Sequence, residues 1–252
     1  MINLKSAHEI ELMRRAGKLT AEARALAGSM IRPGVTTWEI DREVDKFIRK
    51  NGAVPSFYHY NGFPASVCIS INQEVIHGIP DRNRRLQEGD IVSVDVGAKL
   101  NGYHGDCAAT FPCGEISPEA RQLIQVTRES FFRGIANARE GKRVGDISAA
   151  VQAYAESFGY GVVREYVGHG VGTNLHEPPE VPNFGKTNKG PRLLRGMTIA
   201  VEPMINAGTP GVVKLSNGWT IVTADGKWAA HYENTILITG DGEPEILTAP
   251  AI

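Results

Sequence analysis

The chain has 252 residues, 42% hydrophobic and 22% charged, which excludes a disordered, collagenous or coiled-coil protein. Its 27 Lys and Arg residues balance 28 Asp and Glu, so a net charge of −1 leaves no basic surplus for nucleic acid, and no apolar run reaches the ~20 residues of a membrane span. The three cysteines form no CxxC pair, which disfavours a disulfide framework and favours reduced thiols. We therefore expect a cytoplasmic protein with one domain over residues 1–252.

Capping signals and breakers predict four helices. Ser6 and Glu9 form one capping box and Thr36 and Glu39 another, while Pro118 suits the first turn of a third helix. Glycines and prolines set the expected ends. The predicted helices cover residues 6–30, 36–52, 117–141 and 146–159.

Between and after the helices lie apolar runs rich in β-branched residues. The predicted strands cover residues 66–71, 91–98, 103–111, 162–166, 197–205 and 231–239. The order is two helices, strands, two helices and strands, which predicts an α+β fold with helices covering one face of a mainly antiparallel sheet. It also suggests two similar halves.

Two aspartates interrupt the most hairpin-like part of the chain. Asp95 lies in a valine-rich strand, Asn101-Gly102 is a strong turn signal, and Asp106 lies on the return strand. Their odd separation puts both side chains on one face of a hairpin with an even-numbered loop, with Cβ atoms roughly 5–8 Å apart. A solvated turn residue would also explain Asp106, but Asp is rare in strands such as the one around Asp95. Two such carboxylates favour a cation between them.

Three further polar residues interrupt Gly-rich or apolar segments. His169 lies in Gly168-His169-Gly170-Val171-Gly172, which is not a GxGxxG motif, and Glu202 and Glu233 each interrupt an apolar strand. An isolated glutamate of this kind is usually an edge residue facing water. Together with the two aspartates, however, this set suits two divalent ions, and its oxygen-rich chemistry favours Mn, Fe or Co over a thiolate-bound structural Zn. The full set of candidate metals is Co, Mn, Fe and Zn. Two ions about 3.5–4 Å apart can share carboxylates and hold a bridging, acidified water as the nucleophile.

These residues resemble those of the methionine aminopeptidases, over nearly the whole chain. The resemblance is carried by Val94-Asp95-Val96-Gly97, Tyr103-His104-Gly105-Asp106, the glycine-rich run around His169, Val201-Glu202-Pro203 and Tyr232-Glu233-Asn234-Thr235. It implies the pita-bread fold, a single catalytic domain of two pseudo-symmetric halves. It also implies removal of the initiator methionine from nascent, deformylated chains with a small second residue, at the ribosome. A monomer is the default expectation, because the sequence shows no extra interface element.

The resemblance assigns roles to the five residues. Asp95 would bind the first metal, His169 and Glu202 the second, and Asp106 and Glu233 would bridge both. Glu202 would also carry the proton of the attacking water to the leaving amine. The short spacing between His169 and Glu202 and the lack of a zinc-finger extension match the bacterial type 1 form.

Other site residues follow from the same resemblance. His77 would contact the scissile amide nitrogen and His176 would stabilise the oxyanion. Each could instead be a structural or surface histidine, which the sequence without the resemblance favours for His77. The methionine pocket would be lined by Tyr60, Phe63, Cys68 and Trp219, which ordinary core packing would also explain. The sequence departs from the usual family pattern at Phe63, Leu175, His231 and Asn234.

Two rival interpretations remain open. A prolidase or Xaa-Pro aminopeptidase would share the fold, but such enzymes usually carry an extra N-terminal domain. A metal-free pita-bread binding module would have lost metal ligands, and the five positions all carry ligand-type side chains here.

Overall fold

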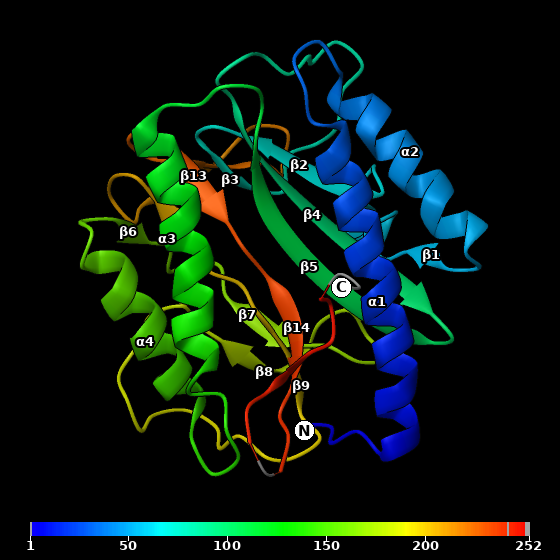
Figure 1. The fold of residues 1–252 in the computed structure, drawn as a ribbon, viewed down its shortest axis with the longest axis vertical. Helices are drawn as coiled ribbons and strands as arrows, with labels where there is room; N and C mark the ends of the chain where they lie inside the picture. Colours follow the sequence, from blue (N-terminus) through cyan, green and yellow to red (C-terminus); the bar gives the residue numbers. More distant parts are fainter. Residues whose placement is uncertain (1, 241, 250–252) are drawn as a thin grey trace.

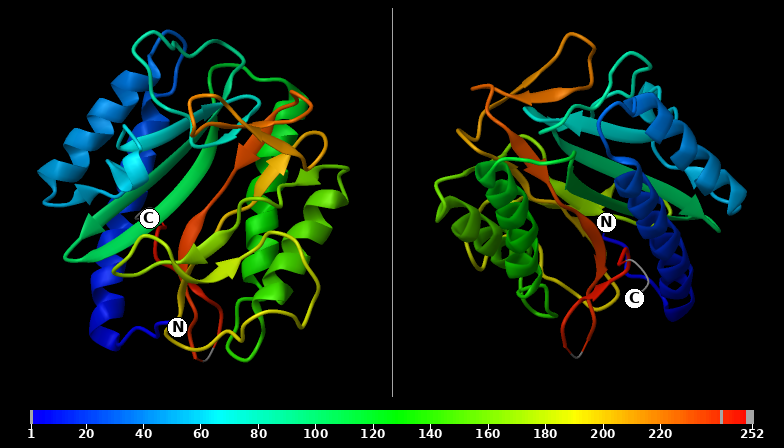
Figure 2. Two further views of the ribbon diagram at one scale, coloured as in Figure 1. Left: turned by 180° about the vertical axis from the view of Figure 1, so that it is seen from behind. Right: turned by 45° about the horizontal axis from the view of Figure 1, so that its top comes forward.

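Four α-helices lie on one side of the strands in the computed structural model, which describes residues 2–240 and 242–249 (Figure 1). Seen from behind, the strands lie in front of the helices (Figure 2). The helices are α1 (Ala7–Met30), α2 (Thr37–Lys50), α3 (Pro118–Ile135) and α4 (Val144–Glu156), and a 3₁₀ turn covers Tyr60–Gly62. The predicted α+β order and its four helices are confirmed.

The first two helices begin as their capping boxes predict. Ser6 and Thr36 are the N-caps, and each exchanges hydrogen bonds with the glutamate three residues later. The third helix ends earlier than predicted, because the N–H groups of Asn137 and Ala138 donate to carbonyls three residues back and tighten the chain into a turn. The fourth begins earlier, since Asp146 accepts from the Arg143 N–H and so lies inside the first turn.

The strands form four sheets, and every pairing among the described residues is antiparallel. The first sheet holds β1 (Val54–Pro55), β2 (Val67–Ile71), β4 (Ile91–Leu100) and β5 (Tyr103–Pro112), and the second holds β6 (Gly161–Val162), β10 (Met204–Asn206) and β13 (Ala229–His231). The third holds β3 (Glu74–Ile76), β11 (Val212–Lys214) and β12 (Ile221–Thr223). The fourth holds β7 (Gly168–Gly170), β8 (Glu177–Val181), β9 (Thr198–Val201), β14 (Asn234–Leu237) and β15 (Glu245–Ile246).

Three predicted strands differ from the observed ones. The run over 197–205 is broken between β9 and β10, where Pro203 has no N–H to give to a ladder. The run over 231–239 is broken opposite it, between β13 and β14. The run over 162–166 keeps only β6, after which the chain leaves the sheet.

The β4–β5 hairpin has the predicted register. Asn101 and Gly102 have φ values of 51° and 87°, which is the backbone of a two-residue turn with both central residues left-handed. Asp95 pairs with Ala108 and Asp106 with Gly97, so the two aspartates are diagonal neighbours on one face. The prediction made from their odd separation is confirmed.

Each helix pair covers its own strands with an apolar face. On α2, Ile40, Val44 and Ile48 recur every fourth residue and pack with β2 and β4. In the other half, Phe131 of α3 and Ile147 of α4 pack with β9 and β14. Each fully buried aliphatic side chain contributes about 1.5–3 kcal/mol. The two helix pairs thus bury equivalent faces, as expected for two similar halves.

The two halves meet where β5 runs beside the break between β13 and β14. Ala108 and Glu233 exchange backbone hydrogen bonds of 3.2 and 2.9 Å there. On either side, the Thr235 hydroxyl accepts from the Asp106 N–H and donates to its carbonyl, and the Thr110 hydroxyl does the same for His231. Two threonine side chains therefore continue the ladder on either side of the Ala108–Glu233 pair.

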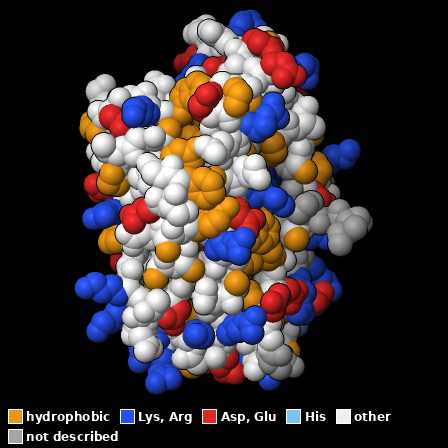
Figure 3. Space-filling model, turned by 60° about the vertical axis from the view of Figure 1, so that its left-hand side comes forward, with side chains coloured by type: hydrophobic (Ala, Val, Ile, Leu, Met, Phe, Trp, Pro, Cys, Tyr) orange, Lys and Arg blue, Asp and Glu red, His pale blue; other side chains and the backbone are white. Residues whose placement is uncertain are grey.

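The outer surface carries no dominant charge on the side that Figure 3 shows, where acidic and basic side chains are interspersed. This distribution agrees with the near-zero net charge. None of the helices formed by residues 2–240 and 242–249 is long and apolar enough to cross a membrane.

A buried ion pair ties the N-terminal segment to a loop of the second half. Lys5 Nζ lies 2.7 Å from Glu177 Oε2, and the two side chains are 5% and 3% exposed. Glu177 Oε1 also accepts from the Asn174 N–H, and the Lys5 N–H donates to the Gly196 carbonyl. The pair therefore fixes the loop that carries His176.

Replacing Lys5 by Met should destabilise the protein strongly, because it leaves the Glu177 carboxylate buried without its cation. We expect a loss of about 3–5 kcal/mol in the free energy of unfolding, measured by urea denaturation. The control is Lys46→Met, which removes an exposed ion pair with Glu43 and should leave stability unchanged within error. Equal, small effects of the two substitutions would show that the Lys5–Glu177 pair stabilises nothing.

Candidate metal centre

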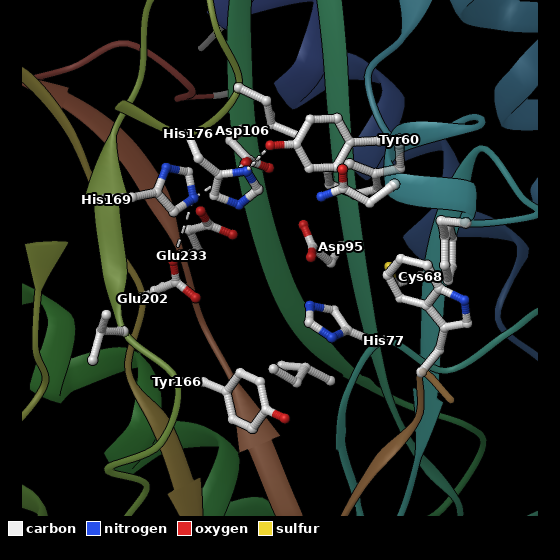
Figure 4. Close-up of a pocket in the computed structure, with 17 residues that line it drawn as sticks. Tyr60, Cys68, His77, Asp95, Asp106, Tyr166, His169, His176, Glu202 and Glu233 are labelled. Carbon is white, nitrogen blue, oxygen red and sulfur yellow. Dashed lines mark hydrogen bonds and ion pairs between the residues drawn. The ribbon is translucent and has the colours of Figure 1, made fainter. Parts of the chain in front are cut away.

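One pocket of about 220 Å³ brings together all the site residues predicted from the sequence. Their side chains point into a common space between the two halves (Figure 4). They are Tyr60, Phe63, Cys68, His77, Asp95, Asp106, His169, His176, Glu202, Trp219 and Glu233. None of the predicted site residues lies outside this pocket.

Four carboxylates form one wall of the pocket. Asp95 and Asp106 come from the β4–β5 hairpin, and Glu202 and Glu233 come from the two strand breaks. The pairings on either side of the breaks keep one register, which places Glu202 opposite Glu233. The two strand breaks thus place Glu202 and Glu233, from the second half, opposite Asp95 and Asp106 of the β4–β5 hairpin.

His169 completes this acidic group with a defined tautomer. Its Nδ1 lies 2.9 Å from the Gly170 carbonyl, and a carbonyl can only accept, so Nδ1 carries the proton. Burial lowers the pKa of His169 to about 3, which keeps the ring neutral. Its Nε2 lone pair therefore faces Glu202 Oε1 at 3.6 Å and Asp106 Oδ2 at 3.7 Å.

The acidic group is electrostatically costly without a cation. Burial raises the pKa of Asp95 to about 7. Burial and the neighbouring carboxylates raise the pKa values of Asp106 and Glu233 well above their usual range, and Glu202 is raised in the same way. The positive charge of Arg24 partly offsets the negative charge of these carboxylates, since it lowers the pKa of Asp95.

Arg24 also connects the acidic group to the rest of the fold. Its guanidinium, on α1, donates to the carbonyls of Ala108 and Glu233 and to Asn234 Oδ1, at 3.0–3.2 Å. Asn234 Oδ1 thus accepts this hydrogen bond and also accepts one from the Thr248 hydroxyl. The first helix thereby fixes the backbone of a glutamate from the opposite half.

The donor set fits divalent metal ions. Asp106, His169 and Glu233 each offer a ligand atom, and these atoms lie within 4.8 Å of one another. Asp95 Oδ1 and Asp106 Oδ1 are buried and have no hydrogen-bond partner among residues 2–240 and 242–249. Buried oxygens without donors, beside an imidazole lone pair, are the arrangement that a hard or borderline cation would satisfy.

The opposite wall is apolar and aromatic. Phe63 lies edge-on to Trp219 with ring centroids 5.1 Å apart, and Phe57, Cys68 and Leu175 pack in the same cluster. Burial raises the pKa of the Cys68 thiol well above its usual value, so this wall carries no charge. A flexible thioether side chain would be well matched by these surfaces.

Two histidines lie between the acidic and apolar walls. His176 Nδ1 is 2.8 Å from the Tyr60 hydroxyl, and its ring centroid is 4.1 Å from that of His169. His77 has a left-handed backbone with φ 59°, and its ring meets Tyr166 edge-on at 5.9 Å. Burial lowers the pKa of His77 to about 4, so that its ring is neutral.

Tyr166 lines the pocket, although the sequence gives it no such role. The run over 162–166 predicts a strand, whereas the chain after β6 turns to line the pocket. The short polar and glycine-containing segment around Arg164 and Glu165 was the available signal against a strand. His231 was noted only as a departure from the family pattern, and it proves to be buried beside Glu202.

Comparisons with known proteins agree with this geometry. The model of metallopeptidase family M24 matches residues 11–240. Methionine aminopeptidase of Clostridium acetobutylicum is 58% identical over 98% of this chain and 99% of that protein, and methionine aminopeptidase 1 of Bacillus subtilis is 51% identical over 96% and 97%.

Solved structures give the same result. Methionine aminopeptidase from Thermotoga maritima superposes with a TM-score of 0.96 at 45% identity, covering 98% of this chain and 99% of that one. Prolidase from Pyrococcus furiosus has a TM-score of 0.80 at 24% identity and is covered over 66% of its length, so it shares the fold alone. The α+β pita-bread fold is confirmed. The chain belongs to metallopeptidase family M24 and, within it, to the methionine aminopeptidases.

Proposed function

We propose that this protein removes the initiator methionine from nascent, deformylated polypeptides that have a small second residue. The observation that carries the proposal is the shared pocket, in which a metal-type donor set faces an apolar wall suited to a thioether. Family membership supports a metal-dependent peptidase that acts on N-terminal methionine.

We assign two divalent ions to the acidic wall. Asp95 would hold one ion, His169 and Glu202 the other, and Asp106 and Glu233 would bridge them. The contacts of 3.6–3.7 Å from His169 Nε2 to carboxylate oxygens support this arrangement, because ligand atoms around one ion are separated by such distances. When bound, the ions supply Lewis acidity and acidify water near neutral pH. Their identity stays open among Co, Mn, Fe and Zn.

The acidic wall would also select the substrate terminus. A free α-amino group in its neutral form would offer a nitrogen lone pair to an ion held by this wall, whereas a formylated terminus is an amide without an available lone pair. The methionine side chain would then lie along the wall of Tyr60, Phe63, Cys68 and Trp219. An α-amino group held at the acidic wall would fix the register of the chain and limit cleavage to the first peptide bond.

Glu202 is the residue best placed to move a proton. As one of the proposed metal ligands, it would lie within hydrogen-bond reach of a water held in the pocket, which a proton carrier needs. Its Oε1 lies 3.6 Å from His169 Nε2, and its Oε2 lies 3.8 Å from His231 Nε2. Glu202 would take the proton of the attacking water and deliver it to the leaving amine.

His176 would donate a hydrogen bond to the substrate carbonyl as negative charge develops there. This needs a proton on Nε2, and the Tyr60 hydroxyl, 2.8 Å from Nδ1, can enforce that tautomer by donating to Nδ1. Burial raises the pKa of Tyr60, so the phenol keeps its proton. Neutral His77 would contact the scissile amide nitrogen from the opposite side.

The cellular setting follows from the substrate. Initiator methionine occurs on chains leaving the ribosome, so we propose a cytoplasmic enzyme that works there, as a monomer and without a nucleic-acid or membrane function. We also propose that residues 1–252 act as one catalytic domain. This proposal is supported by the division of the five proposed metal ligands between the two halves, so that neither half alone could form the site.

The proposed function is tested by turnover of Met-Ala-Ser after metal-free protein is titrated with Mn, Fe, Co or Zn. Release of free methionine is expected, with none from formyl-Met-Ala-Ser and none from a Xaa-Pro peptide. Asp106→Asn is the control, because it removes one bridging carboxylate. Release from the Xaa-Pro peptide alone would favour the prolidase alternative. Failure of the wild type to bind more metal than the variant would favour a metal-free binding module.

His176→Ala should keep its metal content and lose most of kcat. A single hydrogen-bond donor to a developing oxyanion is typically worth about 10²–10³ in rate. Steady-state kinetics and elemental analysis of the same preparation give both numbers. Turnover equal to that of the wild type would remove His176 from the reaction.

The metal-free protein should lose stability as pH rises from 6.5 to 8.0. Buried carboxyls with raised pKa values, such as Asp95 at about 7, bind protons in the folded state that the unfolded chain has released, so unfolding becomes easier as they ionise. Buried histidines with lowered pKa values act in the opposite sense, but only below about pH 6.5.

Thermal unfolding at several pH values measures this effect. The midpoint Tm should fall across the range without metal and stay level with saturating Mn²⁺. Asp106→Asn should show a shallower fall, because it removes one of the repelling carboxyls. A Tm that is flat or rising in metal-free wild type would contradict the electrostatic account.

A further inference from the structure

His231 is a buried imidazole that the proposed reaction does not use. It ends β13, and only 2% of its surface is exposed. Neither Nδ1 nor Nε2 has a hydrogen-bond partner within residues 2–240 and 242–249. A buried ring N–H without an acceptor costs about 1–3 kcal/mol, so a partner is expected when the protein is active.

The nearest anionic group to this ring is the carboxylate of Glu202. His231 Nε2 lies 3.8 Å from Glu202 Oε2, and His169 Nε2 lies 3.6 Å from the other oxygen, Oε1. The Glu202 carboxylate therefore stands between two imidazoles. His169 presents a lone pair to it, because its proton is on Nδ1. His231 has no contact that fixes its proton, so it is free to present an N–H.

The backbones of both residues are held firmly. The His231 N–H and carbonyl both bond to the Thr110 hydroxyl, at 2.8 and 2.9 Å. The Glu202 carbonyl accepts from Asn183 Nδ2 at 2.8 Å. Shortening the 3.8 Å separation to a hydrogen bond of about 2.9 Å would therefore come from rotation of the two side chains.

We propose that His231 is a positioning residue for Glu202, a role that rests on the proposed metal centre. Its Nε2–H donates to Glu202 Oε2 and turns Oε1 toward the ion that Glu202 shares with His169. Groups that hydrogen-bond a metal ligand from behind fix its orientation and typically change metal affinity by about 10–100-fold. The same bond orients the carboxylate that carries the proton.

Two substitutions separate the hydrogen bond from simple packing. His231→Met fills the space without a donor, and His231→Gln keeps an amide N–H near the position of Nε2. Calorimetric titration of the metal-free proteins with Mn²⁺ should show about 10–100-fold weaker binding for His231→Met. Binding by His231→Gln should stay within about threefold of the wild type, as expected where the donor is kept. Circular dichroism checks that both variants fold.

The outcomes distinguish this inference from the function on which it rests. A wild type that binds no Mn²⁺ contradicts the metal centre itself. Wild type that binds Mn²⁺ with the same affinity as His231→Met overturns the role of His231 alone, as does equal weakening in both variants, which would indicate lost packing.

If the variants do not fold, the wild type still provides a test. In Zn²⁺-loaded protein, ¹⁵N NMR of the His231 ring should report a proton on Nε2. A proton on Nδ1 with Nε2 unprotonated would overturn the proposal, because such a ring cannot donate to Glu202.

Discussion

The mutual repulsion of four buried carboxylates is the constraint around which this protein is built. They are Asp95, Asp106, Glu202 and Glu233. A compact chain with a net charge of −1 has enough cations to neutralise them, yet among residues 2–240 and 242–249 only Arg24 lies close to them. The repulsion is therefore left for a bound cation to offset, and the fold supplies the stability that keeps the four groups together.

That stability comes from two equivalent halves. Each half buries the apolar face of a helix pair against its own strands, and the two meet along β5 and the break between β13 and β14. Thr110 and Thr235 join these strands through their hydroxyls, at positions that flank the Ala108–Glu233 pair. Because Asp106 and Glu233 lie on this seam, hydrogen-bonded backbone fixes their positions, which favours a preorganised site.

Capping residues and the hairpin turn predicted the helix starts and the shared face of the two aspartates. The helix starts at Ser6 and Thr36 depend on side chains three residues away, and the face shared by Asp95 and Asp106 depends on a two-residue turn between them. Such features need only neighbouring residues. Periodicity could not show that Glu202 and Glu233 would oppose each other, because that register depends on strands distant in the sequence. Their common site was inferred from the set of acidic residues that interrupt apolar segments, and their individual roles came from the family resemblance.

The errors have the same origin. The runs over 197–205 and 231–239 look continuous in hydrophobicity, but each crosses from one sheet to another at a glutamate. The third helix was predicted to reach Gly141, where the structure has already turned to pack α4 against α3. His231 carried no local sign of its burial beside Glu202. In each case tertiary contacts determine the outcome.

The central claim is that the four carboxylates and His169 together bind two metal ions. Anomalous X-ray diffraction from Mn²⁺-soaked crystals tests this claim most directly. The account predicts two peaks in the pocket about 3.5–4 Å apart, with Asp106 and Glu233 in contact with both. Peaks confined to the outer surface, or a pocket in which the carboxylates coordinate no manganese, would contradict it.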